Sequence, residues 1–171
     1  MLIRREVPAD VPVIHAVTAS AFAKPDVSVS VEAALVDQLR AGDSWLPELS
    51  FVAIGDREQV VGHVVCTRGH VDDVPVLALG PLSVHPDHQR RGVGLALVHS
   101  VLGAGDAAGE PLVCLLGSPD YYGRFGFQAS REFGIVPPDL SWDTYFQVRP
   151  LTAYDPAVRG AFAYAEPFNH I

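Results

Sequence analysis

The chain has 171 residues, 49% of them apolar, which suffices for one packed domain and is not the composition of a disordered protein. Its 12 basic and 20 acidic side chains give a net charge of −8, which excludes the basic surface of a general nucleic-acid binder. No run of about 18 uncharged apolar residues is present to span a membrane. The amino-terminus lacks the apolar stretch of a signal peptide, so we expect a cytoplasmic protein. Cys66 and Cys114 lie in apolar runs and are expected to be buried, reduced thiols.

The first half of the chain predicts one strand, two helices and three further strands. A helix is expected to open at residues 8–10, because the apolar residues that follow then share one face. A second helix is expected after Ser30, again with apolar residues at fourfold spacing. A turn signal at residues 55–56 separates two short apolar runs and predicts a hairpin. The strands expected in this half are residues 2–6, 51–54, 60–67 and 76–84.

The second half predicts a buried helix, a buried strand, a short helix and two more strands. Residues 93–102 are apolar nearly all round a helix, and residues 112–116 form the unalternating apolar run of a strand covered on both faces. Ser118 and the proline after it mark a helix start, and the glycines that follow keep this helix short. Strands are expected from Phe127 and over residues 145–148, the latter being the last in the chain.

The order of these elements is typical of a single α/β domain, residues 1–171, with a mixed sheet rather than a doubly wound one. No internal repeat, low-complexity stretch or linker divides the chain. Residues 152–171 fit no clear element, and we expect this tail to cover a sheet edge or to contribute to a homodimer contact.

Gly92 and Gly94 lie between a predicted strand and the predicted buried helix. The first amides of a helix are free to bind an anion, and glycines let the backbone approach phosphate oxygens closely. Arg90 and Arg91 add positive charge and can engage phosphate in a forked geometry. The pattern lacks the Gly-Lys-Ser/Thr end of a Walker loop, and Leu97 stands where a dinucleotide fingerprint has its third glycine. We therefore expect an anion site in this loop.

This loop and a second segment resemble a known family. The run from Leu82 to Leu97 is similar to the acetyl-CoA motif of the GNAT superfamily of N-acetyltransferases, Gln/Arg-x-x-Gly-x-Gly/Ala after an apolar strand ending in Val-x-Pro. The run from Tyr121 to Phe127 resembles the later Tyr-x-x-x-Gly-Phe motif of that family, in the right order and at the right spacing. The opening of the chain resembles the family more loosely, so the likeness covers roughly residues 2–150.

The resemblance implies a fold and a reaction. The fold is a single-domain mixed β-sheet of about six to seven strands, splayed in the middle and flanked by about four α-helices. The reaction moves the acetyl group of acetyl-CoA to a primary amine, on a small molecule or a protein, by direct attack and without a metal.

The resemblance also assigns roles to residues. Leu82, Ser83 and Val84 are implied to line the pantetheine arm, with one backbone N–H near Val84 polarising the thioester carbonyl. Tyr122 matches the tyrosine that protonates the departing thiolate, and Ser118 stands where the family contacts the pantetheine and the leaving group. The residues implied to wrap the pyrophosphate are Gln89, Arg90, Arg91, Gly92, Val93, Gly94 and Leu95.

Two features depart from the family pattern. Many members carry a carboxylate on the strand before the loop, where this chain has the apolar residues 76–79, so the proton acceptor is open among Glu48, Asp73, His63 and a water relay. Many carry an asparagine where this chain has residues 117–118. The missing carboxylate motivates an alternative, a non-catalytic acyl-CoA-binding or sensor module. A third reading keeps the fold but uses another acyl donor or an oxygen acceptor.

No motif encodes the acceptor. We expect it to be set by the first two helices, by the loop Ala23–Ser30 and by the segment Trp142–Phe146. The acidic net charge favours a cationic amine, and we expect a small molecule. His85 and His88 have the spacing of a metal site, but no third ligand converges in the sequence, and we expect a solvated loop.

Overall fold

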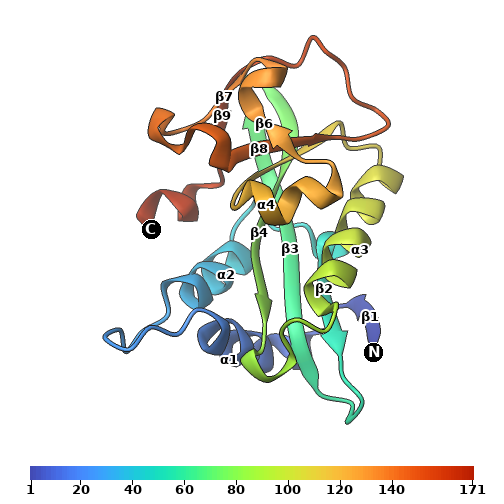
Figure 1. The fold of residues 1–171 in the computed structure, drawn as a ribbon, viewed down its shortest axis with the longest axis vertical. Coiled ribbons are helices and arrows are strands. Elements are labelled where there is room, and N and C mark those ends of the chain that lie inside the picture. The colour runs from blue at the N-terminus through green and yellow to red at the C-terminus, as the bar shows by residue number, and fades with distance from the viewer.

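The computed structural model describes all 171 residues, Met1–Ile171. Its strands are β1 (Leu2–Arg5), β2 (Ser50–Ile54), β3 (Val60–Val71), β4 (Val74–Val84), β5 (Leu112–Leu116), β6 (Gln128–Ala129), β7 (Ile135–Val136), β8 (Phe146–Pro150) and β9 (Gly160–Ala163). They form one mixed sheet in the order β1-β2-β3-β4-β5-β8-β6, with β9 paired to β3 and to β7. The long strands β3 and β4 run through the middle of the molecule (Figure 1).

Four α-helices flank the sheet, as α1 (Val11–Ala21), α2 (Val31–Ala41), α3 (Val93–Ala107) and α4 (Pro119–Tyr122). The hydroxyl of Ser30 accepts a bond from the N–H of Ala33 at 3.1 Å, so α2 begins at the capping residue that the sequence indicates. Short 3₁₀ turns connect the elements, among them η1 (Pro8–Asp10), η2 (Pro47–Leu49), η3 (Pro86–His88), η4 (Gly123–Phe125), η5 (Ser130–Phe133), η6 (Leu140–Tyr145) and η7 (Glu166–His170).

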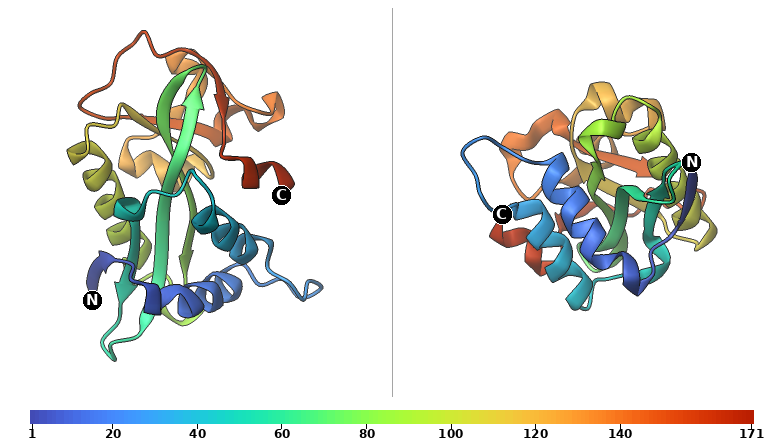
Figure 2. Two further views of the ribbon diagram at one scale, coloured as in Figure 1. Left: turned by 180° about the vertical axis from the view of Figure 1, so that it is seen from behind. Right: turned by 90° about the horizontal axis from the view of Figure 1, so that it is seen from below.

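The helices cover opposite faces of the sheet, as the views in Figure 2 illustrate. Successive residues of a strand point to opposite faces. On β2, Val52 packs with Ile14 of α1 and Val36 of α2, whereas its neighbour Ala53 belongs to the cluster that contains Leu97 of α3. The face with α1 and α2 and the face with α3 are therefore separate layers of the core.

β4 and β5 separate in the middle of the sheet. They run parallel and pair only at Leu77–Val113 and Ala78–Cys114. Beyond Ala78, β4 continues beside β3 alone, with a register shift opposite Cys66. The expected splayed, mixed sheet is thus confirmed, and the far edge of β4 is left without a strand partner on the way to its end at Val84.

The carboxy-terminal part differs from the expectation. Residues 146–150 form β8, but they are not the last strand, because β9 in the tail pairs with β3 through His70–Ala163 and Val71–Phe162. The isolated tail sequence is too short and irregular to predict this pairing, which is possible because β2 begins at Ser50 and pairs with β3 only as far as Val65. The strand expected from Phe127 contains only two residues in β6. These short strands raise the count from the expected six or seven to nine.

Both cysteines, Cys66 and Cys114, are buried and unpaired, and burial raises the pKa of each thiol. No helix combines the length and the apolarity that crossing a membrane requires. His85 and His88 face each other edge to ring at 5.9 Å, and no group of three or more His, Cys, Asp or Glu side chains is arranged to hold a metal ion.

Candidate functional site

A cavity of about 500 Å³ lies at the end of β4, over the first turn of α3, and we call it the β4–α3 cavity. Further lining comes from Ala21 and Phe22 at the end of α1 and from Tyr121 and Arg124 in and after α4. Eight of the eleven residues expected to hold a cofactor line it, namely Leu82, Val84, Gln89, Arg90, Gly92, Val93, Gly94 and Leu95. Three segments that are distant in sequence, residues 21–22, 82–95 and 121–124, therefore meet around one space.

The loop between β4 and α3 has a conformation suited to an anion. Arg90 and Gly92 have φ angles of 62° and 81°, and the left-handed region is costly for most side chains but open to glycine. The side-chain amide of Gln89 donates to the carbonyl of Val84 at 3.0 Å, which ties the loop to the strand. Because the amides in the first turn of α3 have no acceptor within the helix, they are available to a ligand.

The space around Gly94 shows whether a phosphate-bearing group fits in the cavity. A Cβ at Gly94 would lie 2.8 Å from the hydroxyl of Tyr121, 3.7 Å from Val84 and 4.0 Å from Leu82. Only hydrogen at this position leaves the space between α3, β4 and α4 open. The glycine, the free amides and the unpaired Arg90 together suit the pyrophosphate and the slender arm that the sequence indicates.

Three of the expected residues lie outside the cavity. Arg91 lines a neighbouring cavity of about 500 Å³ beside Asp87. Ser83 is buried on the opposite face of β4, where its hydroxyl lies 3.2 Å from that of Thr18 in α1. Ser118 starts α4 through its backbone, because its carbonyl accepts the N–H groups of residues 121 and 122 at 3.2 and 3.0 Å.

The two tyrosines of the second motif have different surroundings. Tyr121 lines the β4–α3 cavity, and the guanidinium of Arg124 lies 4.8 Å from its ring. Tyr122 points into the packing at the splay, where its ring lies 5.8 Å from that of Phe127 and would meet any Cβ added at Gly117. Burial, with a smaller contribution from Tyr121, raises the pKa of Tyr122 to about 12, so its hydroxyl is protonated at neutral pH.

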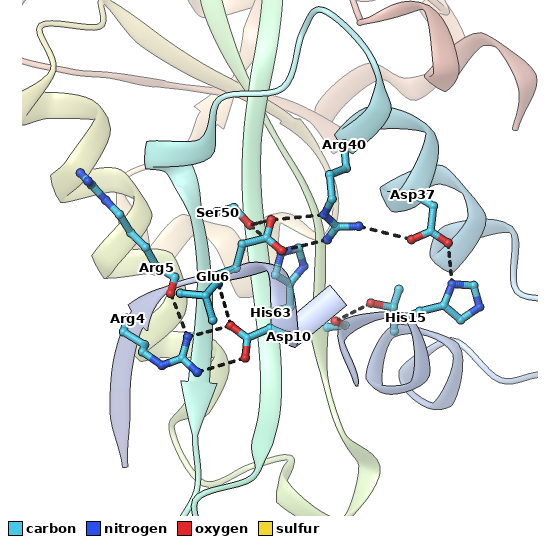
Figure 3. Close-up of polar contacts among 12 residues, drawn as sticks. Arg4, Arg5, Glu6, Asp10, His15, Asp37, Arg40, Ser50 and His63 are labelled. Atoms are coloured by element: carbon cyan, nitrogen blue, oxygen red, sulfur yellow. Dashed lines mark hydrogen bonds and ion pairs between the residues drawn. The ribbon is translucent and has the colours of Figure 1, made fainter. Parts of the chain in front are cut away.

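None of the three side chains considered as proton acceptors lines the β4–α3 cavity. Glu48 is exposed in η2, and Asp73 is exposed in the turn between β3 and β4, at the opposite end of β4 from Val84. His63 is fully buried beneath α1 (Figure 3). Burial, with a smaller contribution from the nearby Arg40, lowers the pKa of His63 to about 3.

His63 belongs to a closed polar network. The hydroxyl of Ser50 donates to Glu6 at 2.8 Å and lies 2.9 Å from Nε2 of His63. Since the hydroxyl proton is directed at Glu6, Nε2 of His63 carries the proton and donates to Ser50, and Nδ1 is left without a partner. Glu6 is also paired with Arg40 at 3.0 Å. The network therefore stabilises the face under α1 and α2 and does not open into the cavity.

Residues 3–130 match the family model described as the acetyltransferase (GNAT) domain. The chain belongs to this family. It is 32% identical over 172 residues to the uncharacterized N-acetyltransferase YhbS of Escherichia coli strain K12, a match that covers 99% of this chain and 98% of YhbS. YjhQ, another uncharacterized N-acetyltransferase of that strain, is 36% identical over 103 residues, or 58% of this chain and 56% of YjhQ.

Solved GNAT structures superpose on the whole fold. The crystal structure of Escherichia coli YhbS in complex with CoA matches with a TM-score of 0.87 at 30% identity, covering 98% of this chain and 91% of YhbS. A GNAT family acetyltransferase from Brucella melitensis in complex with acetyl-CoA matches with a TM-score of 0.79 at 34% identity, covering 98% and 97%. The protein is thus an N-acetyltransferase with the GNAT fold.

Sequence reasoning missed four lining residues, Ala21, Phe22, Tyr121 and Arg124. The end of α1 reaches the cavity only through the packing of α1 against β3 and β4, which no local pattern encodes. Tyr121 and Arg124 had a usable signal, because residues three apart share one side of a helical segment. The prediction centred on Tyr122, whereas the side of this segment that lines the cavity carries Tyr121 and Arg124.

Proposed function

We propose that this GNAT enzyme transfers the acetyl group of acetyl-CoA to a primary amine on a small molecule. The observation that carries the proposal is the β4–α3 cavity itself, which joins the free edge of β4, the left-handed loop and the first turn of α3 beside Arg90. The complexes of the Escherichia coli and Brucella melitensis proteins with CoA and acetyl-CoA support the choice of donor.

Residues of the loop and strand hold the donor in this proposal. The amides of Gly92, Val93 and Gly94, with the side chains of Arg90 and Arg91, neutralise the pyrophosphate. The backbone of Leu82, Ser83 and Val84 is available for hydrogen bonds along the pantetheine arm, because no strand pairs with this edge of β4. Ser118 contributes through the start of α4 at the inner end of the arm.

In the reaction, the amine nitrogen attacks the carbonyl carbon of the acetyl thioester, and the carbon–sulfur bond breaks. The departing thiolate gains a proton, and the nitrogen of the new amide loses one. A backbone N–H near Val84 would stabilise negative charge on the carbonyl oxygen. The hydroxyl of Tyr122 donates toward the departing sulfur. With a pKa of about 12 against about 8.5 for a free thiol, complete transfer of its proton would be uphill by about 5 kcal/mol. Tyr122 therefore serves first as a hydrogen-bond donor to the thiolate.

Water is the proton acceptor in this proposal. Glu48, Asp73 and His63 do not line the cavity, and the fully buried His63 is neutral at any pH well above its pKa of about 3. An alkylammonium must lose its proton before its nitrogen can attack, so kcat/KM should rise with pH until the amine substrate is mostly neutral in solution.

The acceptor is proposed to bind in a second cavity of about 240 Å³ within the loop between α1 and α2, here called the loop cavity. Phe22 lines both this cavity and the β4–α3 cavity. Its lining includes three exposed apolar side chains, Val27, Val29 and Val31, and two side chains of opposite charge, Lys24 and Glu32, neither of which forms an ion pair. A short amine with an apolar chain fits this volume and composition.

A release assay for the free thiol of CoA, run with acetyl-CoA and a panel of small amines, tests the function. We expect thiol release that depends on both the amine and the protein. Propionyl- and succinyl-CoA in the same assay compare other acyl donors.

One observation favours the alternative of a non-catalytic acyl-CoA-binding module: no carboxylate lines the β4–α3 cavity. Calorimetry that detects tight acetyl-CoA binding, together with no acetylated product from any amine in the panel, would replace the enzymatic proposal with this one.

A further inference from the structure

The chain contains a single lysine, Lys24, among its twelve basic residues. The other eleven are arginines, whose guanidinium groups stay protonated and do not attack a thioester. Four of the arginines lie around α3 without a carboxylate partner, namely Arg90, Arg91, Arg124 and Arg149. The protein therefore carries two primary amines, the side chain of Lys24 and the amino group of Met1.

Lys24 lies where the chain leaves the β4–α3 cavity. Ala21 and Phe22 line that cavity, and Phe22 also lines the loop cavity together with Lys24. Two residues of chain span at most about 7 Å, so the backbone of Lys24 lies within that distance of the residue that the two cavities share. The lysine is thus in the cavity proposed for the acceptor and next to the cavity proposed for the donor.

The backbone of Lys24 is held in place, whereas its side chain is free. Its carbonyl accepts the N–H of Val27 at 3.2 Å, across a turn that Pro25 favours by presetting its own φ. Lys24 is exposed and forms no ion pair, although Glu32 lines the same cavity. A lysine ammonium on its flexible stem can therefore move through the loop cavity without breaking a contact of the fold.

The amino group of Met1 provides a reference within the same molecule. It lies 3.8 Å from a carboxylate oxygen of Asp56, and Met1 lines the neighbouring cavity beside Asp87 instead of the β4–α3 cavity or the loop cavity. Free α-amines are less protonated at neutral pH than lysine side chains, so uncatalysed acetylation in solution favours an amino-terminus. Faster acetylation of Lys24 than of Met1 would consequently be a property of the site.

We propose that Lys24 is an intramolecular acceptor, so that the protein acetylates its own lysine. The inference rests on the proposed function, because it uses the same donor and the same acceptor cavity. The ammonium of Lys24 loses a proton to water, its nitrogen attacks the carbonyl carbon of the acetyl thioester, and the carbon–sulfur bond breaks. The nitrogen then loses a second proton and the departing thiolate gains one. The products are an acetylated Lys24, CoA with a free thiol, and one proton released to water.

Mass spectrometry of the full chain, incubated with acetyl-CoA and no added amine, tests the inference. Peptide mapping before and after incubation should show acetylation of Lys24 at least about tenfold faster than of Met1, because the side chain is held near the bound thioester. Below saturation, Arg90→Glu combined with Arg91→Glu should slow this acetylation at least about a hundredfold, since the donor is bound less tightly.

A matched pair of variants moves the lysine. Lys24→Arg keeps the positive charge of the loop cavity and removes its primary amine. Lys24→Arg combined with Arg131→Lys places the lysine instead in η5, at an exposed position that lines neither cavity. Acetylation of the lysine introduced by Arg131→Lys should be at least about tenfold slower than that of Lys24 in wild type.

Mixing two variants separates transfer within one molecule from transfer between molecules. Arg90→Glu with Arg91→Glu retains Lys24, and Lys24→Arg retains the donor loop. The first variant should not be acetylated at Lys24 faster in the presence of the second, and the rate constant for wild type should stay the same on dilution. Faster acetylation in the mixture would overturn the intramolecular assignment.

Two further outcomes would overturn the inference. Equal rates at Lys24 and Met1, unchanged in Arg90→Glu with Arg91→Glu, would identify the modification as solution chemistry. Wild type that acetylates small amines but leaves Lys24 unmodified would contradict the inference and leave the proposed function standing. Wild type that acetylates neither small amines nor Lys24 would overturn both.

Discussion

The arginines on the two faces of the sheet differ in whether they are paired with carboxylates. Under α1 and α2, Arg40 is paired with Glu6 and Arg4 with Asp10, and the hydroxyl of Ser50 closes the network onto His63 (Figure 3). Around α3, the arginines have no carboxylate partners. Only the arginines on the α1–α2 face are neutralised by carboxylates of the protein itself.

The difference teaches which charges serve stability and which serve binding. A buried ion pair is costly to break, because removing one partner leaves the other charge uncompensated. An unpaired arginine on an exposed helix edge contributes little to stability and keeps its charge for a ligand. Substitutions of charged residues on the α1–α2 face should therefore lower the free energy of unfolding, whereas substitutions of the arginines around α3 should weaken ligand binding.

The largest effect on binding is expected from reversing charge in the loop. Arg90→Glu combined with Arg91→Glu should weaken acetyl-CoA binding by at least about a hundredfold, since two charge-assisted contacts become repulsive. The midpoint of thermal unfolding should stay within a few degrees of wild type, because neither arginine has a partner in the fold. Calorimetry and a melting curve measure the two quantities, and unchanged affinity would contradict the assignment of the loop.

The largest effect on stability is expected from acid acting on His63. The pKa of His63 is about 3 in the folded protein, against 6.5 for a free histidine, so below about pH 6.5 the unfolded chain binds a proton that the folded chain does not. The free energy of unfolding should therefore fall by about 2–3 kcal/mol between about pH 6.5 and pH 4.5. Urea unfolding across this range measures it.

His63→Gln should flatten this dependence, and His99→Gln, at an exposed histidine on α3, should leave it in place. The carboxylate of Asp10, whose pKa Arg4 lowers, adds its own loss of stability only at more acidic pH. If His63→Gln unfolds with the same pH dependence as wild type, the closed network under α1 is not the source of acid sensitivity.

A smaller effect is expected at the splay between β4 and β5. Tyr122→Phe should lower kcat about thirtyfold while acetyl-CoA affinity stays near wild type, because the hydroxyl is proposed to contact the sulfur only as the thiolate departs. Tyr154→Phe, an equivalent change beside Phe133 in the other core cluster, is the control. A variant that loses affinity instead of rate would make Tyr122 part of the donor's binding site.

The smallest effect is expected in the loop cavity. Val29 is 68% exposed, so Val29→Ser should not disturb folding. It should raise KM for an apolar amine about fivefold and leave KM for acetyl-CoA unchanged, because one apolar contact of roughly 1 kcal/mol is lost. Val136→Ser on β7 is a control at another exposed valine. Equal KM values for the amine in wild type and Val29→Ser would remove the loop cavity from the acceptor site.

Local sequence patterns predicted the loop before α3 and the helix itself, but not the elements that depend on long-range packing. Glycines, a strand end and a helix start are adjacent in sequence, so the loop at Gly92 and the helix after it could be predicted before the structure was known. Phe22 and β9 could not, because each takes its place through packing against strands that are distant in sequence. The pairing of the arginines is likewise a tertiary property, since Glu6 and Arg40 are 34 residues apart.

The central claim is that the β4–α3 cavity holds acetyl-CoA for transfer to an amine. The most direct test is mass spectrometry of a small primary amine after incubation with acetyl-CoA and protein, for wild type and for Arg90→Glu with Arg91→Glu. We predict an acetylated amine with wild type and a rate at least about a hundredfold lower with the variant. An acetylated amine formed equally fast by both proteins, or by neither, would contradict the account.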